Sequence, residues 1–340
     1  MYTRLSPKEN LLRALGREDP EYVPVRRLDG RIPGMARLHY RNSMFYGPGV
    51  DRWGVRWEGG LPAGFEWEPR ISAYAVGHPL ADLRALANYS FPDPEEPDMF
   101  GNMFDGVDHE ANLVMAEVAY LLFERAYMLM GMEAFFVAAA EQPEAVAALL
   151  HRIADYQIAL IRRLIRHGAR AIRSSDDYGG QTSLMMSPRM WRRLIKPELA
   201  RIVGATKEAG AMFFLHSCGH IMEIVPDIIE VGVDVLDPIQ AGANDHARLK
   251  HLYGDRLTFM YGVNSQGALS QGTPEEVEAD VHECIRVLAP GGGYVLGPDN
   301  AVAIPEANYR AYLAAGERYG RYPLAVWSKS CCSNWLELNR

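Results

Sequence analysis

The chain has 340 residues, of which 48% are hydrophobic and 23% are charged. This composition is typical of a soluble globular protein, and the length suits one barrel domain of roughly 250 residues with additions. A net charge of −8 without a basic stripe argues against a nucleic-acid partner. No run of about 18 apolar residues suggests a membrane span, and the amino terminus has no apolar signal core.

The cysteines indicate a reducing compartment. The chain has four of them, which do not form a disulfide framework or a Cys-x-x-Cys pair: Cys218, Cys284, Cys331 and Cys332. We therefore expect a cytoplasmic protein. Cys284 falls within a predicted helix and the last two lie in a polar tail, so Cys218 is the cysteine with the most suggestive surroundings.

The first hundred residues predict an irregular extension. Ser6, Pro7 and Glu9 have the spacing of a capping box, which predicts a helix that ends near Gly16. Residues 22–25 suit a first strand. The long segment 26–97 is rich in Gly, Pro, Trp and Tyr, with a predicted hairpin at 51–57 and a short helix at 80–87. Such a long loop-rich region indicates a functional segment or an added cover.

The rest of the chain alternates between helices and short apolar strands. We predict helices at 110–130, 143–167, 189–208, 221–230, 274–288 and 305–319, and strands at 169–173, 211–215, 233–236, 257–261 and 294–297. The alternation from residue 143 to 319 is typical of a parallel α/β barrel. We divide the chain into an extension and cover (1–100), a barrel that forms one domain with it (101–322) and a tail (323–340).

Polar residues gather where these predicted strands end. Each of them alone is more often a helix cap or a turn residue, but at successive strand ends they would face one mouth of a barrel. They are Asp176 and Asp177, His216 and Cys218, Asp234 and Asp237, Asn264, and Asp299 and Asn300.

The segment His216-Ser217-Cys218 carries the most specific chemistry. Strand alternation places the imidazole and the thiol on the same side, so both can reach one Zn²⁺ ion from a single strand end. Three protein ligands with an open fourth position are typical of catalytic zinc. The alternative is a buried cysteine beside a hydrogen-bonded histidine, without any metal.

Five central segments form recognisable motifs, at 175–181, 186–188, 195–197, 214–219 and 232–238, and two more lie at 7–15 and 51–55. Together they resemble the uroporphyrinogen decarboxylase superfamily, and within it the corrinoid-dependent methyltransferase branch. The resemblance extends over residues 5–320 and implies a TIM-type (β/α)8 barrel with an irregular, partly helical amino-terminal extension.

The resemblance implies a methyltransferase that moves a methyl group between a small methylated substrate or acceptor and a separate corrinoid protein. In that branch a His-x-Cys pair and a later cysteine bind zinc. His216 and Cys218 match the pair, but the later cysteine is absent, and we expect Asp299 in its place, with Asn300 as the alternative. We expect Asp177 and Gln181 to orient the substrate.

By the same resemblance, Tyr178 is expected to line the pocket. The sequence is compatible with a homodimer but does not disclose the oligomeric state. Two alternatives stay open. The decarboxylases proper bind porphyrinogen carboxylates with a Met-Arg-Gln-Ala-Gly-Arg-Tyr segment, which residues 24–31 match poorly although they include Arg26, Arg27 and Arg31. The third hypothesis is a non-catalytic barrel that binds a small ligand or a corrinoid protein.

Overall fold

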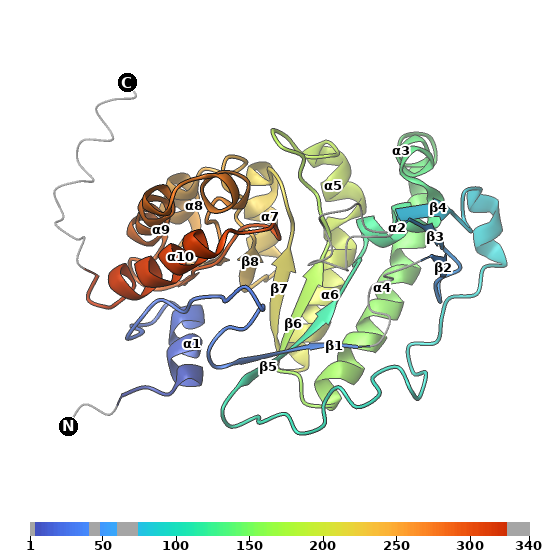
Figure 1. Ribbon diagram of the computed structural model, residues 1–340. Helices are drawn as coiled ribbons and strands as arrows, with labels where there is room; N and C mark the ends of the chain where they lie inside the picture. Colours follow the sequence, from blue (N-terminus) through green and yellow to red (C-terminus); the bar gives the residue numbers. More distant parts are fainter. Residues whose placement is uncertain (1–3, 41–47, 60–73, 325–340) are drawn as a thin grey trace.

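The structure of the protein is a computed structural model that describes residues 4–40, 48–59 and 74–324. Seven parallel strands form one sheet in the order β1-β5-β6-β7-β8-β9-β10 (Figure 1). Their bounds are β1 Met35–His39, β5 Leu113–Val118, β6 Ala171–Ser175, β7 Met212–His216, β8 Val235–Asp237, β9 Thr258–Met260 and β10 Tyr294–Val295.

The predicted first strand lies at the eighth position of this sheet. Val25 forms a parallel bridge with Leu296, next to β10. The amide of Arg26 donates to the carbonyl of Leu296 at 2.8 Å, and the amide of Leu296 donates to the carbonyl of Pro24 at 2.9 Å. With helices between its parallel strands, the fold is the TIM-type α/β barrel that the sequence predicts.

Helices follow most of the strands and cover the outside of the sheet. In Figure 1, α8, α9 and α10 lie together on one side of the strands, and α4 and α6 lie on the other. The helices are α1 Pro7–Gly16, α2 Phe123–Met130, α3 Met132–Glu141, α4 Pro143–Arg166, α5 Pro188–Leu194, α6 Lys196–Glu208, α7 Val225–Glu230, α8 His246–Tyr253, α9 Pro274–Leu288 and α10 Glu306–Tyr319, with short turns η2 Leu83–Ala87, η3 Met222–Ile224 and η4 Ser265–Leu269.

Local chemistry sets several of these boundaries. The capping box is present, because Ser6 Oγ accepts from the Glu9 amide and Glu9 accepts from the Ser6 amide. The predicted helix 189–208 is two helices, and Pro197 near the start of α6 explains the break, since proline cannot donate to the preceding turn. The predicted helix 110–130 is wrong, because its first part is strand β5 and α2 begins only at Phe123.

The segment before residue 100 takes part in the sheet. β1 pairs in parallel with β5, from Met35 opposite Leu113 to His39 opposite Glu117. The predicted hairpin is confirmed, since β2 (Gly49–Val50) and β3 (Arg56–Glu58) pair antiparallel, and β4 (Tyr74–Gly77) extends them. The division of the chain at residue 100 stays a prediction, and the tail with its paired cysteines lies outside the described residues.

The inward-facing side chains change character along the barrel. At the amino ends of the strands they form an apolar cluster that includes Leu113, Met115 and Phe214. Helix α1 contributes Leu11 and Leu15 to this cluster, so it packs against the amino end of the barrel. The inward-facing charged side chains of the strands therefore lie beyond this layer, nearer the opposite, carboxyl ends.

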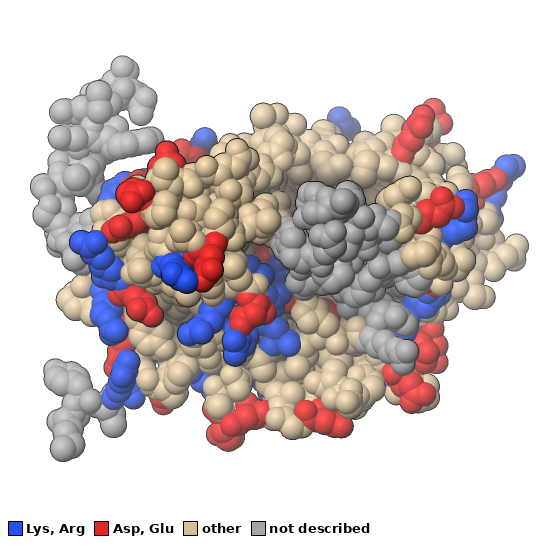
Figure 2. All heavy atoms as spheres, viewed as in Figure 1, with Lys and Arg blue, Asp and Glu red and all other residues tan. Residues whose placement is uncertain are grey.

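The charges on the surface are mixed. Figure 2 shows acidic and basic side chains interspersed over the face seen there. Among the residues that the structure describes, no helix is both long enough and apolar enough to cross a membrane.

Candidate metal centre

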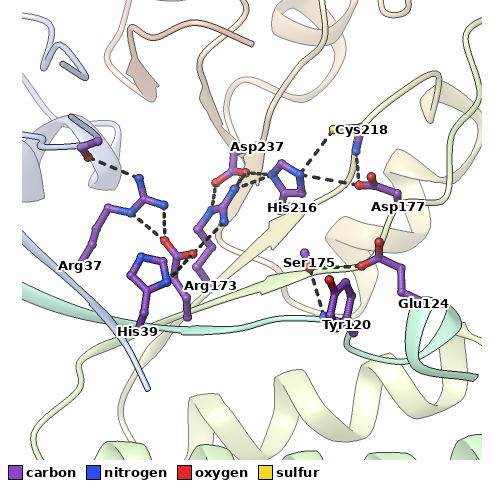
Figure 3. A network of polar contacts seen from close by, with 12 residues as sticks. Arg37, His39, Tyr120, Glu124, Arg173, Ser175, Asp177, His216, Cys218 and Asp237 are labelled. Carbon is purple, nitrogen blue, oxygen red and sulfur yellow. Dashed lines mark hydrogen bonds and ion pairs between the residues drawn. The ribbon is translucent and has the colours of Figure 1, made fainter. Parts of the chain in front are cut away.

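Three potential metal ligands meet at the carboxyl end of the barrel. Asp177, His216 and Cys218 each offer one ligand atom, and these atoms lie within 4.8 Å of one another. His216 Nε2 lies 3.4 Å from Cys218 Sγ and 3.7 Å from Asp177 Oδ1. All three residues are partly exposed, and Figure 3 shows their side chains close together.

The loops after β6 and β7 touch through their backbones, and this contact sets the spacing of the ligands. A Cβ atom on Gly219 would lie 2.3 Å from the carbonyl oxygen of Gly179, and one on Gly179 would lie 2.6 Å from the carbonyl carbon of Gly219. Only glycine fits at both positions. In addition, the amide of Cys218 donates to Asp177 Oδ1 at 2.8 Å.

The imidazole of His216 is oriented from behind by a carboxylate. Its Nδ1 lies 2.6 Å from Asp237 Oδ1, and Asp237 is fully buried. Arg173 Nη2 also lies 2.5 Å from Nδ1, but a nitrogen that carries a proton can only donate, so the Asp237 carboxylate is the partner that satisfies it. This arrangement leaves Nε2 as the nitrogen that faces Cys218 and Asp177 and that could bind a metal ion once it is deprotonated.

Asp237 belongs to a chain of ion pairs that crosses five neighbouring strands, here called the ion-pair chain: Arg37 on β1, Glu117 on β5, Arg173 on β6, His216 on β7 and Asp237 on β8. Arg173 Nε and Nη2 donate to the two oxygens of Asp237 at 2.7 and 2.8 Å. Glu117 accepts from Arg37 Nε at 2.7 Å and from Arg173 at 3.4 Å. Figure 3 shows the chain leading to His216.

The charges in the ion-pair chain stabilise one another. Burial would raise the pKa of Glu117, but Arg173 and Arg37 lower it to about 2. Burial acts in the same way on Asp237, and Arg173 and His216 hold its pKa well below the usual range. For His216, burial and Arg173 act to lower the pKa, yet the contacts with Cys218 and Asp237 raise it well above its ordinary value in the metal-free protein.

A second group of carboxyl groups, here called the acid group, lies on the other side of the metal centre: Glu124, Asp176 and Asp177. Burial raises the pKa of Glu124 well above its ordinary value, and the charges of Asp177 and Asp176 add to that effect. Glu124 Oε2 accepts from Ser175 Oγ at 3.1 Å, and in Figure 3 its carboxyl group points toward Asp177.

Asp176 differs from its neighbours because the start of α2 surrounds it. Its carboxylate accepts from the amides of Leu122, Phe123 and Glu124 at 2.7 to 3.2 Å. Tyr178 adds a fourth hydrogen bond to the same carboxylate, at 2.8 Å. Burial raises the pKa of Asp176, although these donors act to lower it.

Two of the predicted site residues have structural positions instead. Tyr178 is fully buried, with its hydroxyl on Asp176 and its ring against Trp191, so it does not line an open pocket. Asp299 does not join the group of ligand atoms, because its oxygens accept from the amides of Ala241 and Ser265 at 2.8 and 3.0 Å. Backbone amides hold this carboxylate in place.

Gln181 and Asn300 do not join the group of ligand atoms either. Gln181 is exposed, and its Oε1 accepts from Nε2 of Gln240 at 3.4 Å. Oε1 of Gln240 accepts from the amide of Gly219. The Asn300 side chain accepts from the amide of Ala301.

Two other residues that we placed at the mouth serve the fold. Asp234 precedes β8, so it lies at the amino end of the strand, where it binds Lys207 and the amide of Phe213. Asn264 caps η4 through the amide of Gly267. Neither therefore takes part in the metal centre.

Sequence reasoning missed the residues that support the site. Arg37, Glu117, Arg173 and Glu124 were not singled out, and Asp237 was named only as a strand-end residue. The signal was present in the strands: Glu117 and Arg173 are charged residues within short apolar segments. A charged residue in a buried strand requires a partner, and two of them in neighbouring strands predict a pair.

The comparisons with known proteins identify the family. The family model described as uroporphyrinogen decarboxylase (URO-D) matches residues 122–319. The chain therefore belongs to the uroporphyrinogen decarboxylase family of enzymes. A curated uroporphyrinogen decarboxylase from Magnetococcus marinus is 26% identical over 186 residues, which cover 52% of this chain and 50% of that protein. The decarboxylase from Geobacillus kaustophilus is 28% identical over 155 residues, with 42% and 43% covered.

The chain thus spans about half the length of the curated relatives that it matches. Among solved structures, a methyltransferase from Methanosarcina mazei is similar over 93% of this chain and 99% of its own. The TM-score is 0.70 and the identity is 19%. At that identity the similarity establishes a shared fold and leaves the activity to be argued from the site.

Proposed function

We propose that the protein is a methyltransferase of a corrinoid-dependent system. It would move a methyl group between a small methylated substrate or acceptor and a corrinoid protein. The observation that carries the proposal is the group of a carboxylate, an imidazole and a thiol at the barrel mouth. A decarboxylase has no evident use for a thiol and an imidazole held at metal-ligand spacing.

The residues fit a zinc ion. Nitrogen, sulfur and carboxylate oxygen are all zinc ligands, and three protein ligands leave one position for a substrate atom or water. Asp237 fixes the tautomer of His216 that a metal requires, with Nδ1 protonated and Nε2 free. We propose Asp177 as the third ligand in place of Asp299, because it lies beside His216 Nε2.

A zinc ion in this position would act as a Lewis acid on the heteroatom that carries or receives the methyl group. The residues of the chain would do the remaining work. Cys218 and Asp177 each supply one negative charge, so the centre with Zn²⁺ is close to neutral overall. A carboxylate in place of a second thiolate makes the centre harder, which favours oxygen and nitrogen substrates at least as much as thiols.

The corrinoid would be carried by a separate protein that docks over the mouth, and a cytoplasmic location is proposed from the cysteines. Gln181 is exposed next to the loop of Cys218, where it could contact a substrate.

The main alternative is decarboxylation of an acidic tetrapyrrole, which the names of the curated relatives favour. That alternative needs several unpaired guanidinium groups in the cleft. Arg31 is paired with Asp29, and Arg37 and Arg173 are committed to Glu117 and Asp237. Arg26 stacks on the ring of Tyr261. Arg37 and Arg173, which lie inside the barrel, are therefore not free to bind substrate carboxylates.

The test begins with metal content. Zinc-repleted protein should hold one zinc ion, and Cys218→Ala should lower the zinc affinity by roughly two to three orders of magnitude in a chelator competition. Asp177→Asn should lower it as well. Cys284→Ala is the matched control, because Cys284 is a buried thiol in α9 outside the centre. A wild-type protein without zinc, or a Cys218→Ala protein that holds as much as wild type, refutes the site.

Activity distinguishes the remaining hypotheses. Methyl transfer to or from a corrinoid protein, lost in Cys218→Ala, supports the proposal. Turnover of uroporphyrinogen that does not depend on Cys218 would establish the decarboxylase instead. Zinc binding without either reaction would favour a barrel that binds a ligand or a corrinoid protein without catalysis.

A further inference from the structure

We propose a second binding site, for a phosphate-type oxyanion, at the amino end of the barrel. A cavity of about 420 Å³ lies there, at the opposite end of the strands from the metal centre. Leu113 and Val114 begin β5, and Arg170 immediately precedes β6, so their positions fix the cavity at this end. The lining residues are Lys8, His109, Asn112, Leu113, Val114, Arg166, His167, Gly168 and Arg170.

The lining of the cavity is strongly basic. Lys8, Arg166 and Arg170 carry permanent positive charges, and His109 and His167 are further potential donors. None of the nine lining residues is acidic, although the whole chain has a net charge of −8. Such a concentration of cations raises the local concentration of anions.

These cations are only partly neutralised in the described part of the chain. Arg166 donates to Glu95 at 3.1 Å. Lys8 Nζ donates to the carbonyl of His109 at 2.6 Å, which uses one of its three donors. Arg170 Nη1 donates to the carbonyls of Ile165 and Ala169, at 3.3 and 2.9 Å.

The simplest alternative is that the basic residues only compensate the carboxyl end of α4. That end carries about half a negative charge. Three cations against one carboxylate and half a charge leave about one and a half positive charges in the cavity. Nη2 and Nε of Arg170 have no partner among the described residues, so donors remain for a ligand.

The backbone keeps the cavity in shape. Gly168 has φ +113°, and a Cβ atom there would lie 2.6 Å from Cε1 of His109, so glycine lets the His109 ring approach the end of α4. On the far side, the ring of His167 stacks on Phe104 with centroids 5.5 Å apart. The cavity therefore joins three segments far apart in the sequence: the start of α1, the loop before β5 and the end of α4.

Phosphate is the ligand class that this lining suits. Arginine and lysine provide charge-assisted hydrogen bonds to phosphate oxygens, and the volume falls in the range of small-ligand pockets. The cavity is larger than one phosphate group, so pyrophosphate or a phosphate ester should bind more tightly than inorganic phosphate. Because the occupant would join three segments, it should also raise the melting temperature by linkage.

Isothermal titration calorimetry of the full chain in chloride buffer at constant ionic strength tests the site, with pyrophosphate and inorganic phosphate as separate probes. Pyrophosphate should bind saturably with one ion per chain. Lys8→Gln and Arg170→Gln should each raise the Kd at least roughly tenfold. Arg162→Gln is the matched control, because it removes one positive charge from α4 outside the cavity, one turn before Arg166. It should change the Kd by less than about twofold.

A further variant separates this site from the metal centre. Cys218→Ala should bind pyrophosphate as wild type does, because the two sites lie at opposite ends of the strands. The inference is overturned if the native chain shows no saturable binding, if Arg162→Gln weakens binding as much as Lys8→Gln, or if Cys218→Ala abolishes it. Inorganic phosphate that binds as tightly as pyrophosphate would show that the site takes a single phosphate ion. The Lys8 variant keeps the test valid if Arg170→Gln does not fold.

Discussion

Glu117 and Glu124 lie close in the sequence but in opposite electrostatic surroundings. Glu117 ends the inward face of β5 between Arg37 and Arg173, which lower its pKa to about 2 against the cost of burial. Glu124 lies at the start of α2, where burial, Asp177 and Asp176 raise its pKa. The charge of one buried carboxyl group is thus compensated by two arginines, whereas the other carboxyl group lies beside two further carboxyl groups.

The difference separates two roles around the candidate metal centre. The ion-pair chain fixes the position of His216, and each of its carboxylates has a cationic partner. The acid group has no arginine or lysine among its described hydrogen-bond partners, so its charge can change when a metal ion or substrate arrives. Raised pKa values such as those of Glu124 and Asp176 are common among the carboxyl groups of functional sites.

The largest effect should follow from breaking the ion-pair chain. Glu117→Gln would leave Arg37 and Arg173 buried without full compensation, so the free energy of unfolding should fall by about 3–5 kcal/mol. Chemical denaturation at pH 7 measures it. Glu306→Gln is the control, because its pair with Arg310 is exposed on both sides and should contribute less than about 1 kcal/mol. Equal effects of the two substitutions on the free energy of unfolding would contradict a stabilising role of the ion-pair chain.

The pH dependence of that difference follows from the pKa of Glu117. A lowered pKa contributes stability that is present above the ordinary value of 4.5 and is lost as the pH falls through about 2. The gap between wild type and Glu117→Gln should therefore close as the pH falls from 4.5 toward 2. A gap that stays constant over this range would show that the charge of Glu117 is not its cause.

Asp237 connects the ion-pair chain to the metal centre, and its removal should reduce metal affinity. Asp237→Asn keeps the shape but weakens the orientation of His216, so the zinc affinity should fall roughly 10–100-fold. The absorption spectrum of Co²⁺-substituted protein, measured beside the affinity, reports whether the ligand geometry has changed. Unchanged affinity in a folded Asp237→Asn protein would show that His216 needs no support from behind.

Glu124 should show the opposite pH dependence to Glu117. Its raised pKa means that its stability contribution is present below 4.5 and is lost as the pH rises toward the pKa in the folded protein. In metal-free protein, Glu124→Gln should remove a slope of at most about 1.4 kcal/mol per pH unit from the unfolding free energy above pH 4.5. Identical slopes in the variant and wild type would show that the ionisation of Glu124 does not affect the stability of the folded protein.

Asp299 should have the smallest effect on the metal. Asp299→Asn should change the zinc affinity by less than about twofold, because its carboxylate is engaged by two backbone amides away from the ligand atoms. A loss as large as that in Asp177→Asn would restore Asp299 as the third ligand.

Much of the architecture was predictable from the sequence, because short apolar segments and capped helices are local signals. Capping at Ser6 and the glycine after α4 set boundaries that no distant contact had to specify. β5 was mistaken for part of a helix since an apolar run buried on both faces has no strand periodicity. β1 was missed because its sequence, with Arg37 and His39, is too polar for an isolated strand.

The geometry of the candidate metal centre was only partly predictable, for a related reason. His216 and Cys218 share one strand, so their spacing alone places them together. The choice between Asp177 and Asp299 depends on how two loops meet and on which amides capture a carboxylate, and neither is local in the sequence. Partners such as Arg173 and Asp237 become visible only when neighbouring strands are in register.

The contact between Gly179 and Gly219 has a consequence for kinetics. The loop that carries Asp177 and the loop that carries Cys218 touch backbone to backbone, with no flexible side chain between them. Because these backbones are in contact, we expect the two loops to move together, so the release of an ion bound between Asp177 and Cys218 would require that joint movement. If the proposed ion binds there, we therefore expect its exchange to be slow compared with the binding of a substrate.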